Sequence, residues 1–351
     1  MTESELAASE RFDLAGQHSD AINALARATK KHDLEAMTRL GERLLVGDRA
    51  PLLPQDGARF LVDAAHAGGA RAAARVAVLA ATGSHLKQSW QTAFDALVLA
   101  AERGWEPAQT QLILLAADAA SQPFNARSQS LPVARWRTLA ATIDLPAWLS
   151  VPPPQDLHPQ ATVRSVAGLL RRDLCEWLIE QSRTRLAPAR VYDAVSGSEK
   201  THRTRSNTAA KFHLGDMGVL HVIVQARMGA VCGLPMVNME APAVLHYEVG
   251  EEIEDHVDFV DPRAPTYAME LAEKGQRVVT FLIYLNEDYA GGETAFPLLN
   301  VSYRGKAGDG LYFVNASADG APDLRMVHAG RTPTQGEKWI VSQFIRSRAF
   351  R

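Results

Sequence analysis

A histidine and an aspartate stand two positions apart in the stretch HVDF, directly after the acidic run EVGEEIED. Residues i and i+2 of a strand point to the same side of a sheet, so His256 and Asp258 can offer two metal ligands together. A second histidine, His328, follows far downstream in RMVHAG. Two histidines and one carboxylate on one side of a metal leave its other side open. This is the ligand set of mononuclear Fe(II) sites that activate dioxygen.

A lysine, Lys338, begins the next predicted strand in GEKWIVSQF. A buried ammonium beside an open metal face can pair with the distal carboxylate of a dicarboxylate whose 2-oxo acid end binds the metal. An H-x-D pair alone arises often by chance, and a lone histidine such as His213 or His221 more often serves a loop or a core. The order and spacing of His328 and Lys338 make the metal site the preferred interpretation.

The segments that must position these side chains are short strands. They are β-branched and aromatic, and Gly and Asn turns separate them: APAVLHYEV, RVVTFLIYL, GDGLYFVN and KWIVSQFIR. Strands of this length and number predict a sandwich or jelly roll. One amphipathic helix, SVAGLLRRDLCEWLIEQSRTRL, precedes them.

Residues 20–120 are rich in alanine and helical in period. The stretches that begin at Ala64 and Ala100 align at a shift of 36 positions, and the same shift places Gly47 on Gly83, where each glycine ends a helix. A fixed period in this range is typical of stacked helix pairs, each too small to bury its apolar face alone. The pattern resembles Sel1-like repeats. Such an array binds a protein partner on its concave surface, or it dimerises, or it only shields the second domain.

The composition changes near residue 121, and LPAWLSVPPPQDLHP is rich in proline. This predicts a helical repeat domain over residues 1–145, a Pro-rich linker over 146–162 and a β-rich domain over 163–351.

From about Val163 to Arg351 the chain resembles the catalytic domain of prolyl 4-hydroxylases, which are Fe(II)- and 2-oxoglutarate-dependent dioxygenases. The matching stretches are VLHYEVGEEIEDHVDF, GQRVVTFLIYLNEDYAGGETAFP, GDGLYFVNASADGAPDLRMVHAG and GEKWIVSQFI. The resemblance implies an α+β multidomain protein, with the helical array followed by a double-stranded β-helix (jelly roll) catalytic domain. It also implies Fe(II), 2-oxoglutarate as co-substrate, dioxygen and ascorbate as small-molecule partners.

The resemblance implies a role for each site residue. The iron ligands would be His256, Asp258 and His328. Lys338 would bind the 5-carboxylate of 2-oxoglutarate. Tyr247 and Thr280 would donate hydroxyl hydrogen bonds to the co-substrate, with a satisfied core hydroxyl as the alternative for both.

The polar stretch 196–212 resembles a mobile loop over the active site of this family. Arg203 or Arg205 could reach a substrate from it, although a solvated charge is the simpler interpretation. Glu293, in the turn GGET, is interpreted as a solvated or loop-bonding carboxylate.

Two positions depart from the family pattern. Ile253 stands where a tyrosine is common, and Phe344 stands where a tryptophan is frequent. Neither position belongs to the expected iron or 2-oxoglutarate contacts, so both bear on specificity for peptidyl-proline. We therefore expect free proline-repeat peptides to be poor substrates and a loop of a folded protein to be a better one.

The composition of the chain restricts its class. The net charge of −3 and the pI near 6.4 show no overall basic bias of the kind that nucleic-acid binders often have. Two cysteines, an N-terminus without signal-peptide features and the lack of a long apolar run favour a cytoplasmic protein without a membrane span.

The preferred function is Fe(II)- and 2-oxoglutarate-dependent hydroxylation of a C–H bond, in a prolyl or other residue of a protein. A hydroxylase of a small molecule or free amino acid is the alternative within this class. A non-catalytic interaction protein that uses the helical array is the alternative outside it, and the intact ligand set argues against it. A halogenase is disfavoured because Asp258 stands where such enzymes lack the carboxylate.

Overall fold

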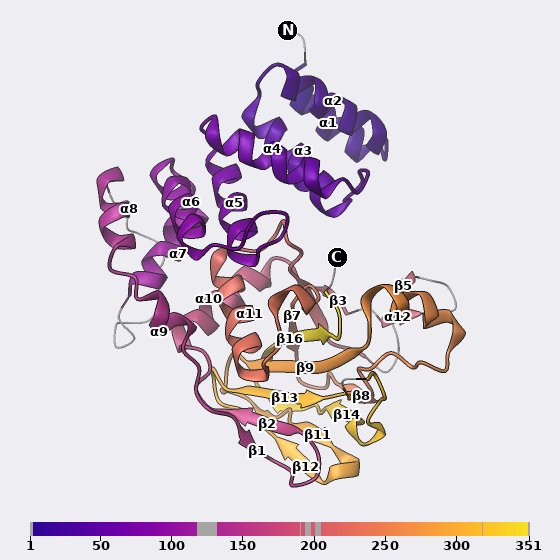
Figure 1. Cartoon of the computed structure of the whole chain (residues 1–351). Coiled ribbons are helices and arrows are strands. Elements are labelled where there is room, and N and C mark those ends of the chain that lie inside the picture. Colours follow the sequence, from indigo (N-terminus) through magenta and orange to yellow (C-terminus); the bar gives the residue numbers. More distant parts are fainter. Residues whose placement is uncertain are drawn as a thin grey trace. The chain divides into compact units, whose positions relative to one another are not determined.

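The computed structural model describes residues 3–117, 132–189, 191–193, 198–200, 205–317 and 319–349. The chain forms two compact units. The helical unit comprises Met1–Leu145 and His213–Ile223, and the β unit comprises Pro146–Phe212 and Val224–Arg351 (Figure 1). A helical array followed by an antiparallel β-domain confirms the predicted fold class.

The helical unit is a series of antiparallel helices in which neighbours in the chain pack together. Its helices are α1 (Glu5–Leu14), α2 (His18–Lys30), α3 (Leu34–Val46), α4 (Pro54–His66), α5 (Ala70–Thr82), α6 (Trp90–Glu102), α7 (Glu106–Ala116) and α8 (Val133–Ala140), and α9 (Leu145–Leu149) begins at its end. Gly47 and Gly83 end α3 and α5 at φ of 71° and 75°, as the shift of the sequence predicts.

Small residues let α3 and α4 approach closely. A Cβ on Gly57 of α4 would lie 2.6 Å from the backbone nitrogen of Leu45 in α3, so this position accepts only glycine. Ion pairs also link neighbouring repeats of the array. Arg71 of α5 pairs with Glu35 of α3 at 3.2 Å and also with Glu42. The array is therefore held by close helix packing together with ion pairs between successive repeats.

A segment far along the chain, His213–Ile223, belongs to the helical unit. Arg75 Nη1 donates hydrogen bonds to the carbonyl oxygens of Gly215 and Met217, the latter at 2.9 Å. Gln111 Oε1 accepts a hydrogen bond from the backbone nitrogen of Leu220 at 3.3 Å. The division predicted from sequence placed this segment in the β-rich domain, over residues 163–351.

The β unit contains two larger antiparallel sheets. Its strands are β1 (Gln155–Asp156), β2 (Val163–Val166), β3 (Ala187–Pro188), β4 (Val191–Asp193), β5 (Ser198–Lys200), β6 (Thr208–Lys211), β7 (Ala243–Tyr247), β8 (Ile253–His256), β9 (Arg277–Tyr284), β10 (Ala290–Gly291), β11 (Thr294–Phe296), β12 (Val301–Tyr303), β13 (Gly310–Val314), β14 (His328–Gly330), β15 (Pro333–Gln335) and β16 (Lys338–Arg346). The eight-stranded sheet has the order β1-β2-β13-β9-β16-β7-β6-β3, and the four-stranded sheet has the order β12-β11-β14-β8.

The core of the β unit lies between these two sheets. Tyr247, Leu282 and Ile340 from the eight-stranded sheet pack in one cluster with Phe296 from the four-stranded sheet. Because side chains alternate along a strand, every second residue of β7, β9 and β16 faces this interior. The remaining positions face helices, as where Gln225 donates a hydrogen bond to Gln343 of β16 at 2.8 Å.

Helices complete the β unit. They are α10 (Arg172–Arg183), α11 (Val219–Cys232), which begins in the helical unit, and α12 (Ala268–Lys274), with short 3-10 turns η1 (Met236–Asn238), η2 (Pro265–Tyr267), η3 (Pro297–Leu299) and η4 (Leu324–Met326). Within the described parts of the chain, no helix has the length and apolar character that crossing a membrane requires.

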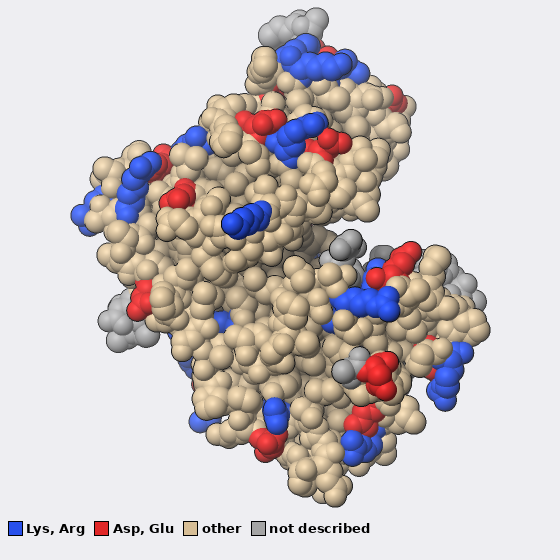
Figure 2. Space-filling model, viewed as in Figure 1, with Lys and Arg blue, Asp and Glu red and all other residues tan. Residues whose placement is uncertain are grey.

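Charged side chains are dispersed over the surface. On the face drawn in Figure 2, basic and acidic groups are interspersed among uncharged residues. Among the described residues of that face there is no broad basic area of the kind that would attract a nucleic acid.

The contacts of Arg75 predict a measurable contribution to stability. Replacing Arg75 by Met removes charged hydrogen-bond donors from two carbonyl oxygens, and such bonds contribute about 1.5–3 kcal/mol. We expect Arg75→Met to lower the free energy of unfolding by about this amount in chemical denaturation followed by circular dichroism. Arg59→Met is the matched control, since Arg59 is exposed and pairs only across one helical turn with Asp56. Equal unfolding midpoints for both variants would contradict this account of the segment.

Candidate metal centre

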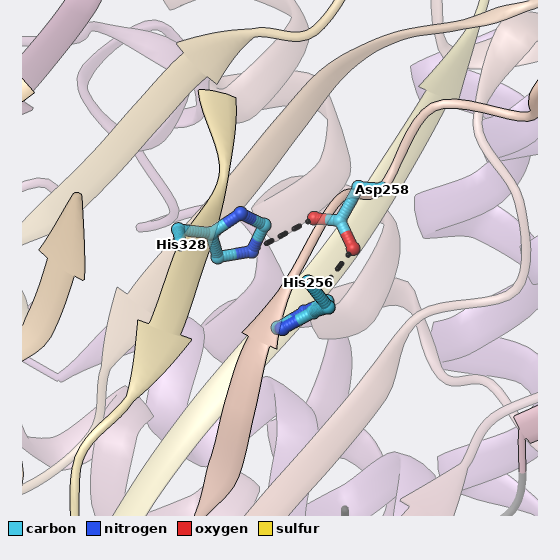
Figure 3. A group of neighbouring side chains, drawn as sticks. All are labelled: His256, Asp258 and His328. Carbon is cyan, nitrogen blue, oxygen red and sulfur yellow. Dashed lines mark ion pairs between the residues drawn. The ribbon is translucent and has the colours of Figure 1, made fainter. Parts of the chain in front are cut away.

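Strands β8 and β14 bring two histidines together. They pair antiparallel, with His328 directly opposite His256. Asp258 lies two residues beyond the end of β8, and its carboxylate turns back toward both imidazoles (Figure 3). Its Oδ1 lies 3.6 Å from Nε2 of His256 and its Oδ2 lies 3.3 Å from Nε2 of His328. The three side chains offer ligand atoms that lie within 4.8 Å of one another.

The histidines are oriented by backbone carbonyls. Nδ1 of His256 lies 2.8 Å from the carbonyl oxygen of Glu254, and Nδ1 of His328 lies 3.0 Å from that of Met326. A carbonyl oxygen only accepts, so each Nδ1 carries the hydrogen and each Nε2 presents a lone pair toward Asp258. Histidines that bind metals are commonly held in this way.

Asp258 supplies a buried negative charge. Burial alone would raise the pKa of its carboxyl group, but His328 and His256 outweigh burial and hold that pKa well below its usual range. A metal ion binds histidine in its neutral form, so two imidazole ligands and this buried carboxylate would present one negative charge to a divalent cation. Asp258 also raises the pKa of His256 despite its burial, so a proton and a metal ion compete for the same nitrogen. The donor set therefore fits Fe(II).

Lys338 is a buried cation without a hydrogen-bonding partner. It is the first residue of β16, opposite Tyr247 of β7. Its side chain is 0% exposed, and among the described residues no acceptor lies within hydrogen-bonding distance of its Nζ. The ammonium lies 4.9 Å from the ring centroid of Tyr247 and 5.7 Å from that of Tyr284. Burial lowers the pKa of Lys338 to about 7, against the opposing influence of the Glu293 carboxylate. This environment fits an anionic group of a bound molecule.

The turn GGET shapes the space beside Lys338. A Cβ on Gly292 would lie 3.3 Å from Cδ of Lys338 and 3.0 Å from the ring of Tyr289, and φ is +70° there. Only glycine lets the backbone pass so close. Two residues later, Thr294 Oγ1 lies 2.8 Å from the hydroxyl of Tyr284. Tyr284, whose ring lies 5.7 Å from the Lys338 ammonium, and Thr294, which contacts Tyr284, are therefore hydroxyl-bearing residues near Lys338 that the sequence analysis missed. The GGET turn was the feature of the sequence that could have pointed to these two residues.

Tyr247 lies between Lys338 and the strand that carries His328. Its ring is beside the Lys338 ammonium, and its hydroxyl lies close to Gly330, where a Cβ would be 3.4 Å away. Burial raises the pKa of Tyr247, so the hydroxyl keeps its proton and can donate it in a hydrogen bond. This position is compatible with the predicted contact to a co-substrate.

Thr280 lies beside the carboxylate of Asp258. On β9 it stands opposite Phe344, well along β16 from Lys338. Its hydroxyl donates a hydrogen bond to Oδ2 of Asp258 at 2.7 Å and accepts one from Asn315 at 2.8 Å. The register of β9 on β16 thus places Thr280 beside the carboxylate of Asp258, and its contact with a co-substrate stays a prediction.

The loop expected over the site is described only in part. Arg203 lies outside the described residues. Arg205 donates a hydrogen bond to Asn207 at 3.0 Å and forms a β-bridge with Ile253. Its charge acts on the imidazole of His256. Arg205 is therefore near the metal centre, as a residue in contact with a substrate would be.

The two departures from the family pattern have different neighbours. Ile253 packs against the core cluster between the sheets. The ring of Phe344 is covered by the Arg277 guanidinium at 3.9 Å. Glu293 is half-buried and its charge acts on Lys338, so it contributes more than the solvated carboxylate that the sequence suggested.

The isolated histidines play local roles. His221 Nδ1 accepts a hydrogen bond from the backbone nitrogen of Gly218 at 3.0 Å, and His213 stands at the start of the same segment of the helical unit. This agrees with their interpretation as loop or core residues.

Comparisons with known proteins identify the relatives of the β unit. Residues 242–346 match the model of the 2OG-Fe(II) oxygenase superfamily. Prolyl 4-hydroxylase 1 of Arabidopsis thaliana is 31% identical over 191 residues, which cover 50% of this chain and 65% of the relative. Probable prolyl 4-hydroxylase 3 of the same plant is 28% identical over 198 residues, which cover 51% of this chain and 67% of the relative. The chain thus spans about two thirds of these relatives.

Two solved structures show limited similarity to parts of this chain. The viral collagen prolyl hydroxylase of Paramecium Bursaria Chlorella virus-1 matches with a TM-score of 0.41 and 23% identity, covering 54% of this chain and 98% of the other. A Sel1 repeat protein of Oxalobacter formigenes matches with a TM-score of 0.31 and 18% identity, covering 41% of this chain and 60% of the other.

Removal of the Asp258 carboxylate tests the metal centre. We expect Asp258→Ala to lower Fe(II) or Mn(II) affinity by more than the roughly 10- to 100-fold typical of losing a residue that only supports a ligand. We expect the chain to stay folded, although Thr280 loses the acceptor of its hydrogen bond, and circular dichroism checks this. Asp261→Ala, at an exposed aspartate that pairs with Arg263, is the control. Calorimetric titration under anaerobic conditions measures both, and wild-type affinity in Asp258→Ala would exclude this carboxylate as a ligand.

The lowered pKa of Lys338 predicts a dependence of stability on pH. Below about pH 7 the lysine is protonated in both states, so burial of its charge destabilises the folded state fully. Between about 7 and the usual 10.5 only the unfolded state holds this proton, so stability should rise with pH, by at most about 5 kcal/mol.

Urea denaturation at a series of pH values measures this effect. In Lys338→Met the rise attributable to this group should vanish, while Lys306→Met, at an exposed lysine, should keep it. Identical pH profiles for the wild type and Lys338→Met would show that the Lys338 ammonium is not held out of water.

Proposed function

We propose that the β unit, a 2OG-Fe(II) oxygenase domain similar to prolyl 4-hydroxylases, hydroxylates prolyl residues of a protein substrate with consumption of 2-oxoglutarate and dioxygen. One observation carries this proposal. The group His256, Asp258 and His328 occurs in the same core as the buried ammonium of Lys338, for which the described residues offer no acceptor. A metal and a dicarboxylate are the two ligands that these features need.

The proposal assigns a position to each ligand. Fe(II) would bind to Nε2 of His256, Nε2 of His328 and the carboxylate of Asp258. When bound, the iron supplies the activation of dioxygen and the oxidation of the C–H bond. The distal carboxylate of 2-oxoglutarate would pair with Lys338, and its binding would restore the lysine to its charged form.

Residues of the chain would orient the co-substrate and exclude water. Tyr247 has a buried hydroxyl group, and its ring lies beside the Lys338 ammonium, so this hydroxyl can donate to a carboxylate. Phe296 and Phe313 pack on the imidazole of His328, with ring centroids 5.6 and 4.6 Å away. These rings keep one side of the metal centre dry, and a dry site strengthens the pairing of Lys338 with an anion.

The nature of the substrate rests on similarity and on two substitutions. The relatives are named prolyl 4-hydroxylases. Ile253 adds an apolar wall where the family commonly has a tyrosine hydroxyl, and an apolar wall discriminates by only about 1–3 kcal/mol per methylene. We therefore favour a proline in a surface loop of a folded protein over a free proline-repeat peptide. The helical unit would bind that protein, and its dimerisation is the alternative.

A substrate search tests the proposal. The iron-loaded full-length protein is incubated with 2-oxoglutarate and a lysate of its own host, and peptides are searched by mass spectrometry for one added oxygen atom. We expect succinate to form and the added oxygen to lie on proline. His328→Ala is the inactive control. A free poly-proline peptide is tested beside the lysate.

Each other result has a distinct meaning. An added oxygen on another residue type would exclude prolyl specificity. Oxidation of a small molecule alone would favour a small-molecule hydroxylase. A wild-type protein that forms no succinate under any condition would favour a non-catalytic interaction protein. Hydroxylation of free poly-proline at the lysate rate would contradict the argument from Ile253.

Two further expectations belong to this proposal. Ascorbate is expected to support repeated turnover, which assays with and without ascorbate measure. Cys175 and Cys232 are free thiols, which suits a reducing compartment. We therefore propose the cytoplasm as the location, and cell fractionation tests it.

A further inference from the structure

Two consecutive hydrogen bonds lead from the core to the candidate metal centre. Asn315 Nδ2 donates to Thr280 Oγ1 at 2.8 Å, and Thr280 Oγ1 donates to Asp258 Oδ2 at 2.7 Å. Thr280 and Asn315 are fully buried, with 1% and 0% exposure. These groups are therefore shielded from water, and their hydrogen bonds are made with one another.

Chemistry fixes which group donates in each of these two hydrogen bonds. An ionised carboxylate only accepts, and a hydroxyl has a single hydrogen to donate. If the Asn315 amide were turned, its oxygen would compete for that hydrogen and Asp258 would lose its donor. The arrangement with the Asn315 NH₂ toward Thr280 leaves the hydroxyl hydrogen for the carboxylate.

The two hydrogen-bonding residues Thr280 and Asn315 are held by paired strands, whereas Asp258 is not. Thr280 lies on β9, where it pairs with Phe313 of β13. Asn315 follows β13, and its backbone donates to Val278 at 2.8 Å and accepts from Asp323 at 2.8 Å. Asp258 lies beyond the end of β8, outside any strand. Its carboxylate therefore takes its orientation from a hydrogen bond to a rigid neighbouring strand.

The hydrogen bond makes the two carboxylate oxygens different. Oδ2 accepts the Thr280 hydrogen and lies 3.3 Å from Nε2 of His328, whereas Oδ1 has no contact with Thr280 and lies 3.6 Å from Nε2 of His256. A carboxylate that bound a metal through both oxygens would occupy a position that a 2-oxo acid and dioxygen need. An oxygen already engaged by a strong donor is a weaker competitor for the metal.

We infer that Thr280 and Asn315 are positioning residues that hold Asp258 as a one-oxygen metal ligand, through Oδ1, and so keep the open face of the metal free. This inference rests on the proposed function, because it concerns the same metal centre.

The test uses the full-length protein with metals that do not turn over. Mn(II) affinity is measured by electron paramagnetic resonance of the free ion, and the absorption spectrum of bound Co(II) reports its coordination number. Thr280→Val keeps the shape and removes the hydroxyl, and Thr280→Ser restores the hydroxyl. Thr38→Val is the matched control, a buried threonine of the helical unit whose hydroxyl bonds to its own helix.

We expect Thr280→Val to lower Mn(II) affinity roughly 10- to 100-fold and to change the Co(II) spectrum toward a higher coordination number. Thr280→Ser should retain the wild-type affinity and spectrum, and Thr38→Val should match the wild type. Asn315→Leu should shift the spectrum in the same direction as Thr280→Val, and the double variant should add little to Thr280→Val alone.

Several outcomes would overturn the inference. A folded Thr280→Val protein with wild-type Mn(II) affinity and Co(II) spectrum would do so. A Thr280→Ser protein as defective as Thr280→Val would show that packing is what matters and the hydroxyl is not. If Thr280→Val does not fold, an unchanged spectrum in Asn315→Leu decides against the inference. A wild-type protein that binds neither metal would overturn the metal centre itself, and with it the proposed function.

Discussion

The metal centre depends on the register of two short strands. His256 and His328 meet because β8 and β14 pair with these residues opposite each other, and β14 is held on its other side by β11. A slip of one residue in this pairing would turn every side chain of the strand to the opposite face. Asp258 is added to the pair by a turn of the chain and by a donor from the other sheet. The site is thus assembled from both sheets.

Lys338 illustrates the tension between stability and binding. Alternation along β16 places it among Tyr247, Tyr284 and other residues of an apolar core, where a charge is costly. No described residue accepts a hydrogen bond from the Lys338 ammonium. This lack of an acceptor destabilises the folded state, and it also creates affinity for an anion. Gly292 of the GGET turn lets the backbone pass close to the Lys338 side chain.

The sequence indicated which residues could bind a metal or an anion better than it indicated which residues would be their neighbours in the fold. Residue type and spacing suggested His256, Asp258, His328 and Lys338, and the resemblance to prolyl 4-hydroxylases implied their roles. The sequence could not place Thr280, because the position of this residue opposite Phe344 depends on the register of β9 on β16. The membership of His213–Ile223 in the helical unit was equally hidden, since it depends on single contacts such as that from Arg75.

That segment also bears on how such a chain can be rearranged in evolution. The polypeptide leaves the helical unit near Leu145, returns to it at His213 and departs again within α11. A recombination or proteolytic event at the Pro-rich stretch would therefore separate the helices from a piece of their own packing. The helical unit is therefore poorly suited to exchange between proteins as an independent domain. Substitutions in the repeats are expected to co-evolve with residues of His213–Ile223, which lie far away in the sequence.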